Sequence, residues 1–262
     1  MARVILNLAK LNEFVENHHF KMDTIRDAIE LMRPNCYFAS IDFKHAYYSV
    51  LVRPHDRNYL CFEWNGRLYR FRVLAQGLCS SPRVFTKLLK PPLAHLRQQG
   101  VVMLMYIDDS LFVDMDVVEC ERGVQLALKM FDGLGLTVSV KKSVLKPVKQ
   151  IEFLGFVLNS TNMSVTLTDG KKRKIRSLAA GLLKAARPTI QMLAEFIGNV
   201  VAAEPGVTLG PLYYKGLEIT RNAGLKASAG NYDHTITLLE QDRSDIRWWL
   251  ENIMSSDRCV VV

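Results

Sequence analysis

Runs of apolar residues, some continuous and some alternating with polar ones, predict strands through the first two thirds of the chain. Asn65-Gly66 separates two such runs, and this dipeptide favours the two-residue turn of a β-hairpin. The predicted strands comprise residues 36–42, 59–64, 68–72, 101–105, 111–113, 136–140 and 151–158.

Apolar residues spaced close to 3.6 positions apart predict helices between and after these strands. The helical segments are residues 22–33, 83–99, 124–134 and, beyond residue 169, the stretch 190–201. Pro91 and Pro92 should kink the second of them or split it in two. The pattern predicts an α+β fold, with helices on one face of a mostly antiparallel sheet, followed by a helical region.

The Tyr-Ile-Asp-Asp sequence of residues 106–109 lies between two predicted strands, so Asp108 and Asp109 are expected at a hairpin tip. Neighbouring side chains of a regular strand point to opposite faces, and both carboxylates can serve one site only where the backbone turns. A turn allows this. The alternative is an ordinary Asp-rich turn, because Asp is a common turn former.

Asp42 ends the predicted strand 36–42, and a sheet would bring it beside Asp108. Sites for two divalent metal ions need several carboxylates from different elements, because the ions lie about 3.5–4 Å apart and prefer oxygen ligands. Taken alone, Asp42 is better explained as a strand-end or helix-capping residue. Together with Asp108 and Asp109, it indicates phosphoryl-transfer chemistry.

Several motifs, in the expected order, resemble the palm of a reverse transcriptase. Asp42 with the following Ala-Tyr pair resembles the first catalytic motif, residues 76–82 the second, and residues 106–109 the third. Residues 141–142 and 153–156 are similar to a triphosphate-proximal lysine motif and to the primer grip. The resemblance covers roughly residues 3–220, and details before and after Asp42 are similar to retrotransposons of the DIRS type.

This resemblance implies an RNA-directed DNA polymerase that transfers nucleotides from dNTPs to a primer 3′-hydroxyl. Asp42, Asp108 and Asp109 would bind two Mg²⁺ ions, which Mn²⁺ can replace, and Lys142 would donate a proton to pyrophosphate. The implied nucleotide-binding residues are Arg3, Phe43, Tyr47, Gln76 and Gly77, and the implied primer grip is Phe153, Leu154 and Gly155.

Each single assignment has a simpler alternative. Tyr47, the implied steric gate against ribonucleotides, is also explained as a core residue. The Gln76-Gly77 pair is also an ordinary loop sequence, and Lys142 an ordinary solvated lysine. As a whole, the chain has one alternative of another class, namely an inactive retroelement remnant that keeps the fold and binds nucleic acid.

The same resemblance divides the chain into residual fingers (residues 1–35), a palm (36–168) and a helical region similar to a thumb or connection (169–262). Most of the fingers are expected to be missing, which would weaken nucleotide binding, and no ribonuclease H constellation is visible. Ala9 stands where the family usually has Arg or Lys.

Composition agrees with a nucleic-acid partner without requiring one. Lys and Arg total 34 against 26 acidic residues, which gives a net charge of +8 and suits an RNA or DNA template-primer duplex. Five widely spaced cysteines indicate neither a disulfide framework nor a zinc site. Without a stretch of about 18–20 apolar residues or a signal peptide, an intracellular protein of the cytoplasm or nucleus is expected, with no membrane partner.

The basic cluster of residues 171–174, Lys-Lys-Arg-Lys, begins the helical region. It is explained equally well as a phosphate-binding patch and as a solvated helix start or localisation signal. Trp248 and Trp249 could stack on bases, but packing in the protein interior is the favoured interpretation.

Overall fold

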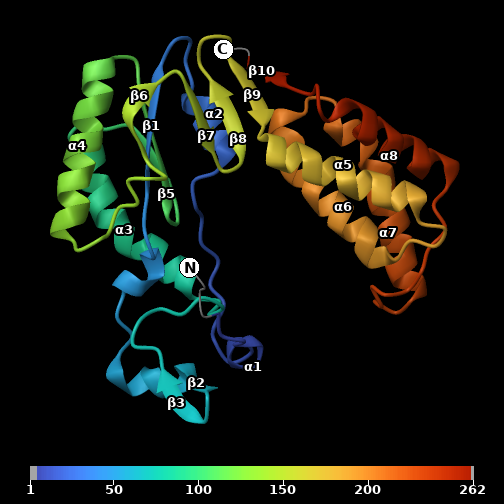
Figure 1. The fold of residues 1–262 in the computed structure, drawn as a ribbon, viewed down its shortest axis with the longest axis horizontal. Coiled ribbons are helices and arrows are strands. Elements are labelled where there is room, and N and C mark those ends of the chain that lie inside the picture. Colours follow the sequence, from blue (N-terminus) through green and yellow to red (C-terminus); the bar gives the residue numbers. More distant parts are fainter. Residues whose placement is uncertain (1–4, 261–262) are drawn as a thin grey trace. The chain divides into compact units, whose positions relative to one another are not determined.

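The computed structural model describes residues 5–260 and contains two compact units, which divide after Lys149 (Figure 1). Each unit combines an antiparallel sheet with helices. The elements of the N-terminal unit are α1 (Ala9–Asn12), α2 (Ile25–Leu31), β1 (Tyr37–Asp42), β2 (Cys61–Trp64), β3 (Arg67–Arg70), α3 (Ser81–Gln98), β4 (Met103–Tyr106), β5 (Asp109–Asp114), α4 (Val117–Gly133) and β6 (Val144–Val148). Two 3₁₀ helices, η1 (Ala46–Ser49) and η2 (Pro54–Leu60), lie between β1 and β2.

The principal sheet of the N-terminal unit has the strand order β4-β5-β1-β6, and all its neighbours are antiparallel. Alternate residues of β1, Ala39 and Ile41, enter a hydrophobic core together with Phe112 of β5. Residues paired across an antiparallel ladder share a face, so the intervening positions of β1 and β5 point to the opposite face. Asp42 and Asp109 are one such pair.

Helices α3 and α4 cover the core face of this sheet (Figure 1), which confirms helices on one face of an antiparallel sheet. The predicted split of α3 at Pro91 and Pro92 is wrong, because the helix runs unbroken through both. Leu89 and Leu93, on either side of the prolines, are buried in the core. Their packing holds both halves against the sheet, which compensates for the hydrogen bonds that proline cannot donate.

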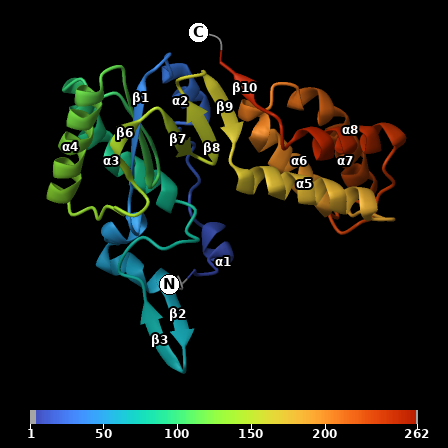
Figure 2. The ribbon, with the colours of Figure 1, turned by 45° about the horizontal axis from the view of Figure 1, so that its top comes forward.

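Asp116 starts α4 earlier than the predicted residue 124, because its carboxylate accepts hydrogen bonds from the backbone N–H groups of Val118 and Glu119. The hairpin predicted around Asn65-Gly66 is confirmed as β2 and β3. Asn65 (φ +50°) and Gly66 (φ +71°) both adopt the left-handed conformation that such a turn needs. Figure 2 shows this hairpin extending away from the four-stranded sheet.

The strand predicted at residues 136–140 is not formed. Within that segment Val138 makes a single bridge to Phe43, and the strand that pairs with β1 is β6, a few residues later. Ser139 explains part of the difference, because its backbone N–H donates to the carbonyl of Asp42 and the chain turns there. Residues 136–140 therefore contain one bridge and a turn, and β6 (Val144–Val148) takes the place beside β1.

The sheet of the C-terminal unit has the strand order β10-β9-β8-β7. Its elements are β7 (Gln150–Phe153), β8 (Phe156–Asn159), β9 (Ser164–Leu167), α5 (Asp169–Lys184), α6 (Ile190–Ala203), η3 (Glu204–Gly206), η4 (Gly210–Tyr213), α7 (Lys215–Ala227), α8 (Glu240–Asn252) and β10 (Arg258–Cys259). The single strand predicted at residues 151–158 is wrong, because Leu154 and Gly155 form a turn between β7 and β8.

Helices α5 to α8 pack around an apolar interior that includes Trp249, which is fully buried. The indole N–H of Trp249 donates to the carbonyl of Tyr213, and the ring of Trp248 stacks on that of Tyr213 at 4.0 Å between centroids. Both tryptophans therefore pack within this unit. Among the helices of residues 5–260, none has the length and apolar character needed to cross a bilayer.

Candidate active site

The turn between β4 and β5 consists of Ile107 and Asp108, and Tyr106 pairs with Asp109 across it. Ile107 has φ +55°, a left-handed conformation that is strained for a β-branched residue. Such strain costs on the order of 1–3 kcal/mol, and it persists where surrounding contacts hold the backbone in that conformation. The turn therefore separates the two carboxylates: Asp109 is part of the sheet, whereas Asp108 lines a pocket.

Asp42 lies directly opposite Asp109, because β1 and β5 pair in antiparallel register from Tyr37 and Asp114 to these two aspartates. Directly opposed residues have their Cβ atoms about 4.5–5.5 Å apart on the same face of the sheet. The backbone N–H of Phe43 also donates to the carbonyl of Asp108 (2.9 Å). The fold thus brings the three predicted carboxylates together at one end of the sheet.

Charge repulsion at this end of the sheet is visible in the pKa of Asp109, which is raised to about 6. Partial burial is the largest cause, and the negative charges of Asp108 and Asp42 add to it. Lys142 acts in the opposite direction. A cation bound among the carboxylates would reverse this balance, because it favours their charged forms.

Asp42 is the most buried of the three, with 9% of its surface exposed. Its Oδ2 atom forms an ion pair with the Lys142 ammonium (3.2 Å), and its backbone N–H donates to the hydroxyl of Ser143 (3.0 Å). The other oxygen, Oδ1, is buried and accepts no hydrogen bond from the described part of the chain. A buried carboxylate oxygen of this kind is suited to bind a cation, because a buried polar atom without a partner costs free energy.

Within residues 5–260, no group of three or more His, Cys, Asp and Glu side chains is arranged to bind a metal ion. The three aspartates interact electrostatically, but their oxygens do not converge on one point. Their chemistry nevertheless fits a hard divalent cation, because carboxylate oxygens are the protein ligands that Mg²⁺ prefers.

A pocket of about 250 Å³ lies beside Asp108. Its lining residues are His45, Ala46, Tyr47, Tyr48, Gln76, Ile107 and Asp108. The pKa of Tyr47 is raised to about 12, first by burial and then by the charge of Asp108, so its hydroxyl stays protonated. The Tyr47 ring also contacts Phe85 edge to face, which fixes it between the core and the pocket.

The loop that carries Gln76 and Gly77 is held by the N-terminal segment. Asn12 donates from its amide to the carbonyl of Gly77 and accepts from the backbone N–H of Cys79, each at 2.9 Å. Gly77 has φ +100°, and a Cβ there would lie 2.5 Å from the carbonyl oxygen of Leu6. Glycine is therefore required for the loop to approach the N-terminal segment this closely.

The remaining predicted residues are placed differently. Arg3 lies outside the described residues. The ring of Phe43 is 2% exposed and packs against Phe131 in the core, so its side chain does not line the pocket. In the C-terminal unit, Phe153 is buried, whereas the half-buried Leu154 and Gly155 form the turn of the β7–β8 hairpin.

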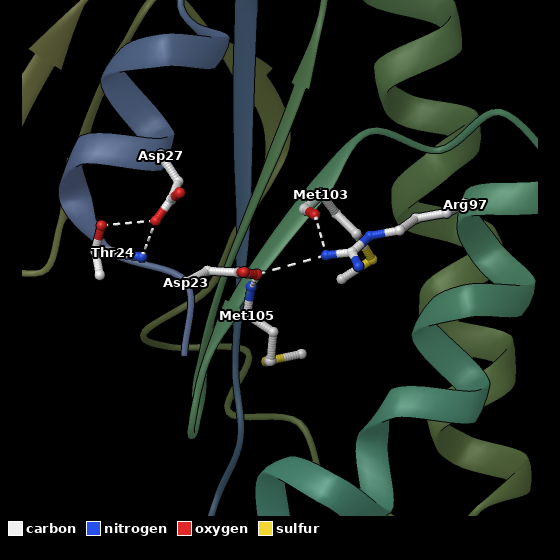
Figure 3. Close-up of polar contacts among 6 residues, drawn as sticks. All are labelled: Asp23, Thr24, Asp27, Arg97, Met103 and Met105. Carbon is white, nitrogen blue, oxygen red and sulfur yellow. Dashed lines mark hydrogen bonds and ion pairs between the residues drawn. The ribbon is translucent and has the colours of Figure 1, made fainter. Parts of the chain in front are cut away.

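The outer edge of β4 is closed by side chains instead of another strand (Figure 3). Asp23 accepts a hydrogen bond from the backbone N–H of Met105 (2.8 Å), and Arg97 donates to the carbonyl of Met103 (3.1 Å). The two side chains also pair with each other at 3.5 Å. Because β4 leads directly into the turn that carries Asp108, these contacts of Asp23 and Arg97, the edge clamp, fix the strand that positions Asp108.

Helix α2 begins immediately after Asp23 and is capped at the same place (Figure 3). The backbone N–H and the hydroxyl of Thr24 both donate to Asp27, each at 2.6 Å. The hydroxyl bond is the main reason that the pKa of Asp27 is lowered. The cap fixes the start of the helix and therefore the position of Asp23 beside β4.

The family model described as "Reverse transcriptase (RNA-dependent DNA polymerase)" matches residues 1–158, which include all three aspartates. The chain belongs to the reverse transcriptase family. Viral relatives agree: a Gag-Pol polyprotein of feline leukemia virus is 26% identical over 207 residues, which cover 75% of this chain and 12% of that polyprotein. A Pro-Pol polyprotein of feline foamy virus is 28% identical over 183 residues, covering 66% and 15% respectively.

Among solved structures, a foamy viral protease-reverse transcriptase in complex with double-stranded DNA matches with a TM-score of 0.74 and 21% identity. The match covers 97% of this chain and 41% of that one, so the likeness establishes a reverse transcriptase fold across both compact units. The chain spans only 12% and 15% of the two viral polyproteins.

Several residues that shape this candidate site were not found from the sequence. His45 and Tyr48 line the pocket, with their rings stacked at 5.6 Å, and Ser143 supports Asp42. Both His45 and Tyr48 follow Asp42 closely in the sequence, before β2, and this proximity could have indicated that they line the pocket. No local sequence signal reveals Asp23 or its hydrogen bond to β4, because that contact joins distant segments.

The Asp109→Asn variant should be more stable than the wild type in metal-free buffer at pH 7.5. Because its pKa is raised, Asp109 contributes stability that is complete below about pH 4 and is lost as pH rises through about 6. A neutral amide has no charge to bury, so the variant keeps this stability at high pH. Solvent screening limits the gain in the free energy of unfolding to about 1 kcal/mol. Thermal unfolding in chelator at pH 4.5 and 7.5 would measure it, with exposed Asp132→Asn as the control. An equal gain at both pH values would contradict the assigned cause.

The Asp23→Ala variant should unfold more readily, by about 1–3 kcal/mol, because the Met105 N–H loses a charged acceptor. Urea denaturation would measure the change, and the Met105 amide should exchange faster with solvent. Glu119→Ala is the matched control, since it breaks the exposed Arg122–Glu119 pair (2.7 Å), whose contribution should be below about 1 kcal/mol. Equal losses in the two variants would refute a special role for the edge clamp.

Proposed function

We propose that this chain is the polymerase region of a reverse transcriptase that extends a primer 3′-hydroxyl with deoxynucleotides on an RNA or DNA template. The observation that carries the proposal is the pairing of Asp42 with Asp109 beside the Asp108 turn. Three carboxylates from two separate segments, β1 and the β4–β5 hairpin, meet at one end of the sheet, and the pKa of Asp109 is raised by burial and by the charges of the other two. Membership of the family of RNA-dependent DNA polymerases supports the same reaction.

Asp42, Asp108 and Asp109 are proposed to hold two Mg²⁺ ions, with Mn²⁺ as a substitute. The buried, unbonded Oδ1 atom of Asp42 and the raised pKa of Asp109 support this set among the described residues. When bound, Mg²⁺ lowers the pKa of the attacking hydroxyl and offsets charge on the triphosphate. The protein contributes a fixed β1–β5 register, which sets the separation of its carboxylates.

Lys142 is proposed to deliver a proton to the leaving pyrophosphate. Its ammonium lies 3.2 Å from Oδ2 of Asp42, and 61% of its side chain is exposed, so it can reach a ligand beside the carboxylates. A cation at this position also stabilises negative charge that develops on the phosphates. The ion pair with Asp42 keeps Lys142 beside the site before substrate arrives.

The pocket beside Asp108 is proposed to receive the deoxynucleotide. Tyr47 would lie under the sugar and exclude a 2′-hydroxyl, and Gln76 and Gly77 would contact the base pair. Edge-to-face packing of Tyr47 on Phe85 supports a gating role, because a rigid ring excludes an extra atom better than a mobile one. Arg3 remains a proposed triphosphate contact, and Phe43 is proposed to act through its backbone only.

A template-primer duplex is the proposed partner. Solved foamy viral enzymes of similar fold are bound to double-stranded DNA or to an RNA/DNA hybrid, and a net charge of +8 suits a polyanion. Residues 1–35, 36–168 and 169–262 are proposed to act as fingers segment, palm and thumb, with Phe153, Leu154 and Gly155 as the primer grip. An origin in a DIRS-type retrotransposon is also a proposal, which rests on the motifs around Asp42.

Primer extension tests the proposed function. The chain should incorporate dTTP on poly(rA) primed with oligo(dT) in Mg²⁺, and Asp108→Asn should lower the rate by about a hundredfold or more, because it removes a charged ligand. Asp132→Asn, which carries the same change on an exposed position of α4, should retain full activity. Tight duplex binding by a wild-type chain that incorporates nothing would favour the inactive remnant instead.

The Tyr47→Ala variant should lose sugar discrimination. Its ratio of kcat/KM for dTTP over UTP should fall about 10–100-fold, because the ring that would clash with a 2′-hydroxyl is gone. Single-nucleotide incorporation in Mg²⁺ would measure the ratio. Tyr48→Ala is the control, since Tyr48 lines the same pocket but packs against His45 and Phe71. Unchanged discrimination in Tyr47→Ala would remove this residue from the gating role.

A further inference from the structure

The turn between β7 and β8 has an unusual backbone. Leu154 (φ +51°) and Gly155 (φ +78°) are both left-handed, whereas Phe153 and Phe156 on either side pair as strand residues. The left-handed region costs a residue such as Leu roughly 1–2 kcal/mol. The two-residue hairpin itself favours left-handed backbone at both positions, but it does not remove the cost at leucine, which contacts outside the hairpin can offset.

Lys171, in the first turn of α5, supplies such a contact. Its ammonium donates to the carbonyl of Leu154 (2.8 Å) and lies 4.4 Å from the ring centroid of Phe156, which is itself buried. Burial lowers the pKa of Lys171. One cation therefore binds both the turn carbonyl and the first residue of the following strand, in a partly dry environment where such contacts are strong.

Gly155 makes room for this lysine. A Cβ built on Gly155 would lie 2.2 Å from Cε and 2.6 Å from Nζ of Lys171. The carbonyl of Gly155 also accepts a hydrogen bond from the backbone N–H of Thr168 (3.2 Å), the residue that precedes α5. Helix α5 thus holds the turn at two successive residues.

We propose that Lys171 is a positioning residue, which locks the Leu154–Gly155 turn in its left-handed form so that this turn can align a primer strand. The alignment rests on the proposed polymerase function, whereas the locking does not. Leu154 and Gly155 would meet the primer through their backbone groups, and the direction of those groups is set by the φ values that Lys171 maintains.

The neighbouring cations argue against a shared phosphate-binding role for the cluster 171–174. Lys172 is 9% exposed and donates to the carbonyl of Met254, and Lys174 pairs with Glu195 at 3.7 Å. The ammonium of Lys171 is likewise directed to Leu154. Lys171 and Lys172 therefore support the fold from within, whereas Arg173 and Lys174 are exposed.

The Lys171→Met variant tests the lock, because it removes the ammonium and keeps the length of the side chain. The Thr168 amide, which bonds to Gly155, should exchange at least tenfold faster with solvent. Primer extension should fall about tenfold or more, since a displaced contact far from the chemistry has effects of this size. The slope of log Kd for duplex against log salt should stay unchanged, whereas loss of a phosphate contact would reduce it by about 1.

Lys184→Met is the matched control, because it removes the same charge from the exposed last turn of α5. It should leave Thr168 exchange and primer extension at wild-type values. Unchanged exchange in Lys171→Met, or a slope reduced by about 1, would overturn the proposal. A wild-type chain without extension activity would count against the polymerase function alone, and exchange at Thr168 would still decide whether Lys171 locks the turn.

A double-mutant cycle provides a second test of the contact. Gly155→Ala should destabilise the wild-type chain for two reasons: alanine is strained at φ +78°, and its Cβ displaces the end of the Lys171 side chain from the turn. In the Lys171→Ala background only the backbone strain remains, so the same substitution should cause a smaller change in the unfolding equilibrium constant. Equal effects in both backgrounds would show that the two side chains do not compete for one space, and would overturn the proposal.

Discussion

The antiparallel pairing of β1 with β5 is the constraint on which the site depends. It places Asp42 opposite Asp109, and the same register places Ala39 opposite Phe112 in the core. A slip of one residue would exchange the two faces of β1 and carry the Asp42 carboxylate into the core that contains Phe112. Burial of the core and assembly of the acidic site therefore depend on one register.

The acidic site itself lowers the stability of the fold. The pKa of Asp109 is raised by burial and by its acidic neighbours, Ile107 is strained, and one oxygen of Asp42 is buried without a hydrogen bond within the described residues. Packing elsewhere compensates, because α3 and α4 bury large side chains such as Phe85 and Phe131 against the sheet. The edge clamp adds support where β4 has no neighbouring strand on its outer side.

Sequence reasoning succeeded where the signal is local. Asn65-Gly66 and the Tyr-Ile-Asp-Asp sequence are turn signals between apolar runs, and both hairpins form. It failed where tertiary contacts decide, as at Pro91 and Pro92, whose helix is held together by buried neighbours. The Leu154-Gly155 turn was hidden inside an apolar run, because only the structure shows the lysine that stabilises a left-handed leucine.

The contacts made by positively charged residues were also not predictable from the sequence. Arg97 donates to a β4 carbonyl, Lys142 pairs with Asp42, and Lys171 donates to Leu154. Each of these cations is tied to a strand or turn that carries a proposed functional group. The net charge of +8 therefore does not show which cations can meet phosphates. Long-range attraction of a duplex depends on the total charge, but its alignment depends on how the cations are committed inside the fold.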